Sequence, residues 1–384
     1  MIERPPLPYG RQWVDATDVQ LVLEALQGDF LTTGPQVERF EASLCAYTGT
    51  TNAAVLNSGT SALHAAYAAI GLGPGDRLIT SPLTFAATGN AALYLGAEVD
   101  FADIDEGTGN LDPESAEAMV KPETRLIVPV DYAGHPADYD AFRRISDKHG
   151  LALVADAAHS LGATYKGRKV GTLADLTELS FHPVKPITTA EGGAVLGGAP
   201  DLIDQVKSFR SHGIIRDPER MERNEGPWYH EMQMLGFNYR LTDLQCALGL
   251  SQMRRLDAFL GRRRDIAARY NHELSGCPGL GLPHVHSDVT PGWHLYVVRV
   301  QGDPGRRRPF FDYLRSKGLG VQVHYLPVYR HPYYERLGYR AGLCPRAEDF
   351  YSRAVSLPLF PKMTDAEVDR VVEAVWSGSQ ELLA

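Results

Sequence analysis

The feature that most constrains the fold is a regular alternation of short apolar runs with amphipathic segments, which begins near residue 52. The apolar runs predict β-strands over 53–56, 77–80, 99–104, 125–130 and 151–155. The segments between them predict helices over 60–70, 86–95 and 139–149. Strands that alternate with helices indicate a large, mostly parallel sheet with helices on both faces. Ligands of such a sheet bind at the carboxyl ends of its strands.

The two ends of the chain predict additional elements. We expect helices over 15–26 and from Gly34-Pro35, and a single long helix from residue 241 with Leu244, Leu248, Leu256 and Leu260 on one side. After the Gly- and Pro-rich segment 276–292 we expect a strand over 294–300, a helix over 309–317, a strand over 321–325 and a last helix at the capping box Thr364-x-x-Glu367. These elements predict a large domain over 1–250 and a smaller C-terminal α/β domain over 251–384.

Charge and cysteine content exclude several classes of protein. The net charge of −9 gives no electrostatic reason to expect nucleic acid or an anionic membrane as a partner. The four cysteines are far apart and include no C-x-x-C pair, so they predict neither a disulfide framework nor a thiolate zinc site. Residues 1–6 contain no apolar signal segment, and no apolar run reaches membrane length. We therefore expect a cytoplasmic protein.

Lys185 lies in a stretch, 180–195, that predicts a strand, a tight turn and a second strand. Pro183 and Pro186 fix the backbone on both sides of the lysine. An amine that is held in one position and partly desolvated suits a Schiff base with a carbonyl compound. For this stretch alone, a surface hairpin lysine is the alternative interpretation.

Two other segments favour the functional interpretation of Lys185. The turn 57–61, Asn-Ser-Gly-Thr-Ser, lies between a strand and a helix, where exposed N–H groups and the hydroxyls of Thr60 and Ser61 can bind a phosphate. Asp156 directly follows an apolar strand, and a buried carboxylate there needs a cationic partner such as a pyridinium nitrogen. A plain helix cap and a turn-capping aspartate are the alternatives, but the order phosphate turn, acid and lysine favours a common site.

Three further candidates are less specific. Phe85 follows Ser-Pro-Leu-Thr and can stack on a flat ring or be an ordinary core aromatic, and Asn238 can be no more than the cap of the long helix. His284 and His286, with His294 nearby, suggest a metal site. Their segment lacks a carboxylate-rich partner set, so a solvated loop is favoured and no metal is expected.

Together these motifs resemble the sugar aminotransferases of the DegT/StrS type, a branch of the fold-type I pyridoxal phosphate enzymes. The resemblance extends from residue 34 to the last helix and is carried most specifically by 57–63, 156–159, 181–185 and 236–240. It implies the fold-type I architecture, pyridoxal 5′-phosphate as cofactor and a homodimer with shared active sites.

The resemblance also implies residue roles. Lys185 would bind the cofactor covalently and move protons, and Asp156 would pair with the pyridine nitrogen. Asn238 would reach the phosphate bound by the neighbouring subunit. The remaining implied cofactor-binding residues are Thr60, Ser61, Phe85, His159 and Ser180.

Within the family, 182–185, 211–214 and 320–329 are most similar to the aminotransferases of pseudaminic acid synthesis. Those enzymes aminate C4 of a UDP-linked 4-keto-6-deoxy-N-acetyl hexose, and the implied donor is L-glutamate. The implied substrate-binding residues are His182, His324 and Tyr325, with His324 and Tyr325 on opposite faces of the expected strand. A structural role for His324 is the alternative. Ala155 and Ala190 depart from the family pattern, which usually has an acidic residue and a glycine at these positions.

The sequence leaves three alternatives to this function. One is an aminotransferase for another nucleotide-linked keto sugar, carried by dTDP or GDP. A pyridoxal phosphate-dependent sugar dehydratase shares the fold, but its lysine is replaced by histidine, so Lys185 argues against it. A non-catalytic, pyridoxal phosphate-binding regulatory or structural protein would be expected to lack Lys185 or Asp156, or to carry an added DNA-binding domain.

Overall fold

The computed structural model describes residues 6–384, and the centre of this part of the chain is a seven-stranded sheet with the order β2-β10-β9-β6-β5-β3-β4. Its strands, in chain order, are β2 (Asn52–Leu56), β3 (Arg77–Thr80), β4 (Glu98–Phe101), β5 (Thr124–Val128), β6 (Ala152–Asp156), β9 (Leu176–Ser180) and β10 (Gly193–Gly197). Neighbours from β4 to β9 are parallel, and β10 is antiparallel to both β9 and β2. The predicted mixed, mostly parallel sheet is confirmed. Residues 1–5, which belong to the segment searched for an apolar signal, lie outside the described residues.

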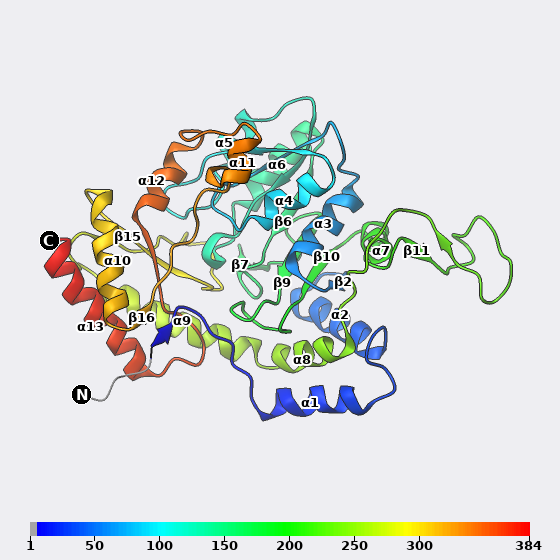
Figure 1. The fold of residues 1–384 in the computed structure, drawn as a ribbon, viewed down its shortest axis with the longest axis horizontal. Coiled ribbons are helices and arrows are strands. Elements are labelled where there is room, and N and C mark those ends of the chain that lie inside the picture. The colour runs from blue at the N-terminus through cyan, green and yellow to red at the C-terminus, as the bar shows by residue number, and fades with distance from the viewer. Residues whose placement is uncertain (1–5) are drawn as a thin grey trace.

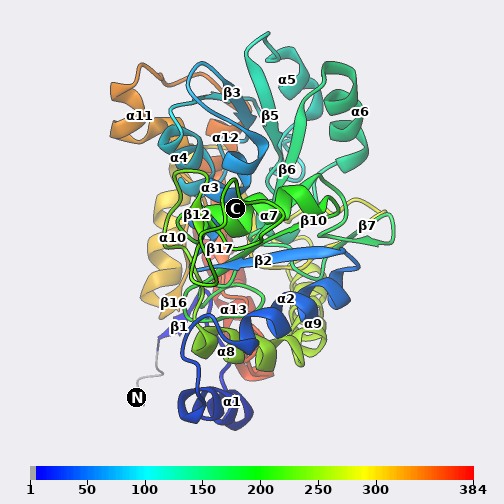
Figure 2. The same ribbon diagram turned by 90° about the vertical axis from the view of Figure 1, so that its right-hand side faces the viewer.

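Helices cover both faces of the sheet, as predicted (Figures 1 and 2). Because side chains alternate along a strand, Leu56 and Val128 enter one core while Val55 and Ile127 enter the other. Residues of α3 (Gly59–Ile70), α4 (Ala87–Tyr94) and α7 (Pro200–Phe209) complete the first core. Those of α2 (Pro35–Thr48), α6 (Tyr139–His149) and α8 (Asp243–Met253) complete the second. This part also contains α1 (Ala16–Gln27), α5 (Pro113–Ala118), β7 (Thr164–Tyr165) and β8 (Arg168–Lys169).

The single long helix expected from residue 241 is wrong, because the structure has two helices there. α8 ends at Met253, and α9 (Leu256–Glu273) begins after Arg255. The Arg255 guanidinium lies 2.6 Å from the buried carboxylate of Asp18 and also bonds the carbonyl of Trp13. The apolar spacing continues across the break, so the sequence pattern does not reveal it.

The C-terminal part has a core of its own. It consists of the antiparallel sheet β13-β15-β17 with α9, α10 and α13, which lie at the opposite end of the body from the arm that carries β11 (Figure 1). The predicted capping box of the last helix is confirmed, since Thr364 Oγ1 accepts from the N–H of Glu367 and Glu367 Oε2 from the N–H of Thr364. The bounds are β13 Leu280–Gly281, β14 Val289–Thr290, β15 Tyr296–Val300, α10 Arg307–Ser316, α11 Pro332–Arg336, α12 Pro345–Arg353, β17 Ala354–Leu357 and α13 Asp365–Leu382.

The first described residues pack with this C-terminal part. β1 (Leu7–Pro8) pairs in parallel with β16 (Leu319–Gly320), and Leu7 is buried in the C-terminal core. α11 and α12, by contrast, place Tyr334 and Phe350 in a core of the large sheet. The division into domains 1–250 and 251–384 stays a prediction.

The strand predicted over 321–325 is wrong. β16 ends at Gly320, and Gln322 makes only an isolated bridge with Ser356. The backbone carbonyl of His324 accepts a hydrogen bond from the hydroxyl of Tyr132 instead of entering a ladder. The segment therefore follows the wall of a cavity, and its side chains do not alternate between two faces.

None of the helices in residues 6–384 combines the length and the apolar character needed to cross a lipid bilayer.

An arm formed by β11 (Ile214–Ile215), β12 (Glu231–Met232) and the segment between them projects from the body (Figure 1). Asn238 lies at the base of this arm, where it bridges to Ser211.

The stretch around Lys185 contains the predicted antiparallel strand pair, β9 and β10, but residues 181–192 connect them in place of a tight turn. Ala190 in this connection has a φ of 67°, in the left-handed region that favours glycine. Its N–H donates to Thr188 Oγ1, which holds the backbone in this conformation. Ala190, which replaces the glycine expected from the family pattern, therefore has a strained backbone conformation.

We expect Ala190→Gly to raise the free energy of unfolding by roughly 0.5–1 kcal/mol, because it removes the Cβ clash of the left-handed conformation. Urea unfolding measures the change. Ala194→Gly in β10 is the matched control and should lower stability, since Ala194 is buried in a strand. A stability of Ala190→Gly at or below that of the parent protein would contradict the strain.

Candidate active site

A cavity of about 500 Å³ opens at the carboxyl ends of β6 and β9. Cofactor pockets in proteins have volumes of this order. The predicted site residues that the structure brings together around it are Thr60, Phe85, Asp156, His159, Ser180, His182, Lys185, His324 and Tyr325.

Asp156 is the last residue of β6, and only 5% of it is exposed. Two donors hold its carboxylate: Thr88 Oγ1 lies 2.6 Å from Oδ2, and the N–H of Ala158 lies 3.3 Å from Oδ1. These bonds fix the carboxylate at the wall of the cavity. The group can therefore face a cation in the cavity.

Lys185 lies in the connection between β9 and β10, in a turn closed by its own N–H and the carbonyl of His182 at 2.9 Å. Burial lowers the pKa of the amine to about 8, and the nearby carboxyl groups of Asp156 and Glu178 oppose that change. A neutral amine is consequently accessible near physiological pH, as nucleophilic and proton-transfer chemistry requires.

Neutral histidines surround the amine. Burial, together with the charge of Lys185, lowers the pKa of His324 to about 4 and keeps the pKa values of His159 and His294 well below their usual range. Their rings therefore add hydrogen-bonding capacity to the cavity without adding positive charge.

The N-terminus of α3 forms the predicted phosphate turn. Ser58 caps the helix, and its N–H and hydroxyl both interact with Ser61 Oγ, so the Ser61 hydroxyl is engaged in the capping box. Ser61 is buried and does not line the cavity, whereas Gly59 and Thr60 do. A Cβ at Gly59 would lie only 2.5 Å from Glu178 Oε1, so glycine lets the turn pack directly on β9. The role of Ser61 toward phosphate stays a prediction.

Two of the alternative interpretations are wrong. Phe85 is 64% exposed at the cavity and is not a core aromatic. Asn238 is not the cap of α8, because Thr242 caps that helix through the N–H of Gln245. Asn238 is exposed and lies outside the cavity of its own chain.

The substrate-binding candidates lie at one side of the cavity. His324 Nδ1 is 2.8 Å from Ser356 Oγ, and Tyr325 Oη is 3.1 Å from His159 Nε2. Both residues line the same cavity, so the expectation that they occupy opposite faces of a strand is wrong. His182 lines the cavity as well and is exposed.

The sequence did not reveal four residues of the site. Glu178, in the middle of β9, could have been noticed as an acidic residue in a central strand, where buried acids are rare. The sequence indicates His294 only as a neighbour of the metal candidates His284 and His286, but its ring centroid lies 4.3 Å from that of His159. Thr88 and Tyr9 carry no signal in the sequence, because nothing in it places them near Asp156.

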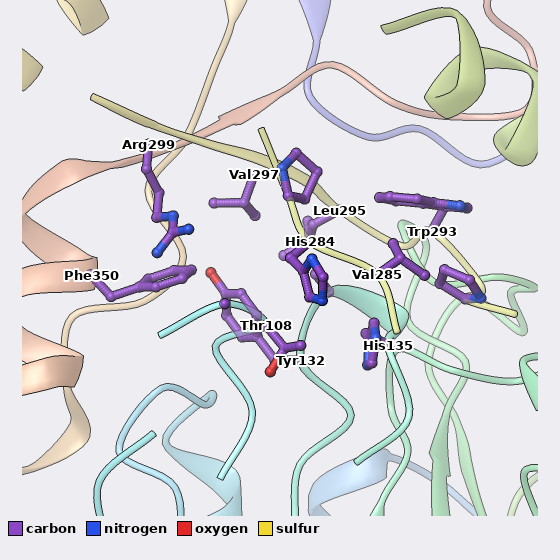
Figure 3. A pocket seen from close by; sticks show the side chains of 14 residues that line it. Thr108, Tyr132, His135, His284, Val285, Trp293, Leu295, Val297, Arg299 and Phe350 are labelled. Atoms are coloured by element: carbon purple, nitrogen blue, oxygen red, sulfur yellow. The ribbon is translucent and has the colours of Figure 1, made fainter. Parts of the chain in front are cut away.

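A second, smaller cavity of about 30 Å³ lies among Tyr132, His135, His284, Arg299 and Phe350 (Figure 3). Its volume suits a water molecule and not a cofactor. Among residues 6–384, no group of three or more His, Cys, Asp or Glu side chains is placed to hold a metal ion, including the segment of His284 and His286.

The residues of the cavity around Asp156 and Lys185 fit a pyridoxal phosphate group. A helix N-terminus, an amine and an acceptor carboxylate face one space of sufficient volume. Three buried polar atoms there, His159 Nδ1, His294 Nδ1 and Glu178 Oε2, have no hydrogen-bond partner within the described part of the chain. With the mostly parallel sheet, this arrangement of Asp156 and Lys185 defines the class of fold-type I pyridoxal phosphate-dependent transferases.

The chain belongs to the DegT/DnrJ/EryC1/StrS aminotransferase family, whose model matches residues 12–376. The protein is thus a sugar aminotransferase, as the resemblance predicted. It is 40% identical over 375 residues to the UDP-4-amino-4,6-dideoxy-N-acetyl-beta-L-altrosamine transaminase of Campylobacter jejuni, covering 97% of both chains. It is also 40% identical over 373 residues to the spore coat polysaccharide biosynthesis protein SpsC of Bacillus subtilis, covering 96% of each.

Solved structures agree with this assignment. Helicobacter pylori PseC, an aminotransferase involved in the biosynthesis of pseudoaminic acid, matches with a TM-score of 0.93 and 32% identity over 98% of this chain and 100% of that one. The PLP-form of Spr1654 from Streptococcus pneumoniae matches with a TM-score of 0.92 and 30% identity over 99% and 100%.

Proposed function

We propose that this protein transfers an amino group from an amino acid, L-glutamate, to C4 of a UDP-linked 4-keto-6-deoxy-N-acetyl hexose, with pyridoxal phosphate as cofactor. The observation that carries the proposal is the meeting of Lys185 and Asp156 in one cavity at the carboxyl ends of β6 and β9. The similarity to an altrosamine transaminase and to PseC supports the choice of sugar. When bound, the cofactor supplies an electron sink for the carbanion.

Each residue has a defined task in this proposal. Lys185 Nζ removes the proton from the α-carbon of the donor and later delivers a proton to C4 of the sugar, which its lowered pKa permits. Asp156 would accept a hydrogen bond from a protonated ring nitrogen of the cofactor. Thr60 and Ser180 would hold its phosphate at the N-terminus of α3, and Phe85 would cover its ring.

The substrate is tested with a panel of UDP- and dTDP-keto sugars assayed with glutamate as donor. We expect the highest kcat/KM for the UDP-linked 4-keto sugar of L-altro type. His324→Ala is expected to lower that value about tenfold, the typical effect of losing one hydrogen bond in a buried site. A clear preference for a dTDP-3-keto sugar would overturn the substrate assignment.

Ser356→Ala serves as the control for His324, because Ser356 bonds His324 Nδ1 and does not line the cavity. It should reduce kcat/KM less than His324→Ala does. An unchanged kcat/KM in His324→Ala would remove this residue from the substrate site.

We further propose that the protein is a homodimer in which Asn238 completes the site of the neighbouring subunit. In support, Asn238 is exposed outside its own cavity, at the base of the projecting arm. Mixing inactive Asn238→Ala and Lys185→Ala proteins, after exchange of subunits, is expected to restore about a quarter of the parent activity, since half of the random dimers contain one intact site. No recovery, with exchange demonstrated by differently tagged subunits, would mean that each site is built from one chain.

A further inference from the structure

Glu178 is a carboxylic acid inside the central sheet, and it has no role in the function proposed above. It is the middle residue of β9, only 1% of it is exposed, and it lines the cavity beside Asp156. In the parallel pairing of β6 and β9, Asp156 is the direct partner of Glu178, so both side chains leave the sheet at the same level.

The surroundings of the two acids differ. Asp156 accepts hydrogen bonds from the hydroxyl of Thr88 and the N–H of Ala158. Glu178 receives no such donor among the described residues, and its Oε2 is buried without a partner. Two adjacent buried carboxyl groups cannot both ionise without a large cost, and the proton goes to the acid whose charge is less well solvated. That acid is Glu178.

The titratable groups that face Glu178 also favour a proton on Glu178 and not on Asp156. Asp156 approaches it from β6, Tyr67 from α3 and Lys185 from the loop after β9. Burial raises the pKa of Glu178 well above its usual range, the charge of Asp156 and a hydrogen bond to Asp156 raise it further, and Lys185 opposes the shift only in part. A proton on Glu178 also keeps a second negative charge away from the phosphate turn, whose Gly59 packs on its side chain.

We propose that Glu178 carries a proton and donates it in a hydrogen bond to Asp156, so that the two acids act as one singly charged pair that positions Asp156 for a cationic ring nitrogen. Glu178 is thus a positioning residue. The protonation of Glu178 does not depend on the proposed function. The positioning of Asp156 for the ring nitrogen does rest on it.

Infrared difference spectroscopy of the full-length protein tests for the proton directly. A protonated carboxyl group gives a carbonyl stretch that a carboxylate lacks. Asp131, whose pKa burial raises to about 7, also contributes this band at lower pH, so the spectra are compared at pH values above it. The parent protein should keep a protonated-acid band there that disappears in Glu178→Gln.

Glu191→Gln is the matched control, because Glu191 lines the same cavity but is exposed. It should leave the band unchanged. The measurement is made without cofactor and after addition of pyridoxal phosphate, and neither sample contains a sugar, so the outcome does not depend on the substrate. Identical spectra for the parent protein and Glu178→Gln would overturn the proposal.

Stability gives a second readout. A folded-state pKa raised above the ordinary value of 4.5 means that the parent protein loses stability as pH rises from that value to the folded-state pKa, because the unfolded chain releases the proton that Glu178 keeps in the folded chain. Glu178→Gln cannot ionise, so its stability relative to the parent should increase as pH rises from about 4.5. If the difference in stability between Glu178→Gln and the parent protein does not change with pH, Glu178 does not carry the proposed proton.

Kinetics separate positioning from simple packing. Glu178→Gln keeps a neutral donor toward Asp156 and should retain kcat within about threefold, whereas Glu178→Leu keeps the volume but loses the donor and should lose about tenfold in kcat with little change in KM. Equal kcat values for the two variants would show that the hydrogen bond does not matter to the reaction.

Discussion

Lys185→Ala is expected to lower kcat by about 10⁴-fold, because it removes both the covalent attachment point and the proton carrier. Lys185 is the one amine among the described residues that line the cavity, so no neighbouring group can replace it. The variant should still bind pyridoxal phosphate, since the N-terminus of α3 with Thr60 and Ser180 is unchanged. Stopped-flow measurement of the half-reaction with glutamate gives the rate, and equilibrium dialysis gives cofactor binding.

Borohydride reduction identifies the attachment site independently. In the parent protein it should fix the cofactor to the peptide that contains Lys185. Lys148→Ala, which removes a surface lysine paired with Glu117, should behave like the parent protein in both experiments. An adduct on any other lysine would refute the assignment of Lys185.

Asp156→Asn is expected to lower kcat by about 10³-fold, the effect of removing a preorganised charge from an active site. Asparagine has the same shape and can still accept the hydrogen bond from Thr88, so the fold should be preserved. What is lost is the negative charge that keeps a ring nitrogen protonated. Rates with glutamate, together with the absorbance of the bound cofactor, measure the effect.

Asp175→Asn is the control for this charge, because Asp175 lies just before the other end of β9 and bonds the N–H of Leu153. It should change stability slightly and leave kcat within about twofold of the parent value. Near-normal activity in Asp156→Asn would mean that the ring nitrogen has a different partner.

The sequence predicted the parts of the site that depend on local pattern. Asp156 and Lys185 could be placed because each follows an apolar strand, and strands of a parallel sheet end at one edge. Ala155, which departs from the family pattern, is buried in the core on the other face of the sheet, so it does not alter the cavity.

The parts that the sequence did not predict depend on contacts between distant segments. Arg255, which directly precedes α9, forms an ion pair with Asp18, more than 200 positions away, and the apolar spacing gives no sign of that contact. Similarly, the segment around His324 alternates like a strand, but its carbonyl bonds the hydroxyl of Tyr132. Thr88, in α4, donates to Asp156 at the end of β6, although 68 positions separate the two residues.

The pairing of β1 with β16 makes the first residues a mechanical link between the C-terminal part and the cavity. The N–H of Leu7 donates to the carbonyl of Gly318, and two residues later the carbonyl of Tyr9 accepts from the N–H of Leu359. The Tyr9 ring lines the cavity, and Gly10 lies against Val184, next to the lysine. Any rotation of the C-terminal part would pull this segment along and carry Tyr9 with it. A chain shortened beyond Tyr9 would therefore lose part of the cavity wall and not only stability.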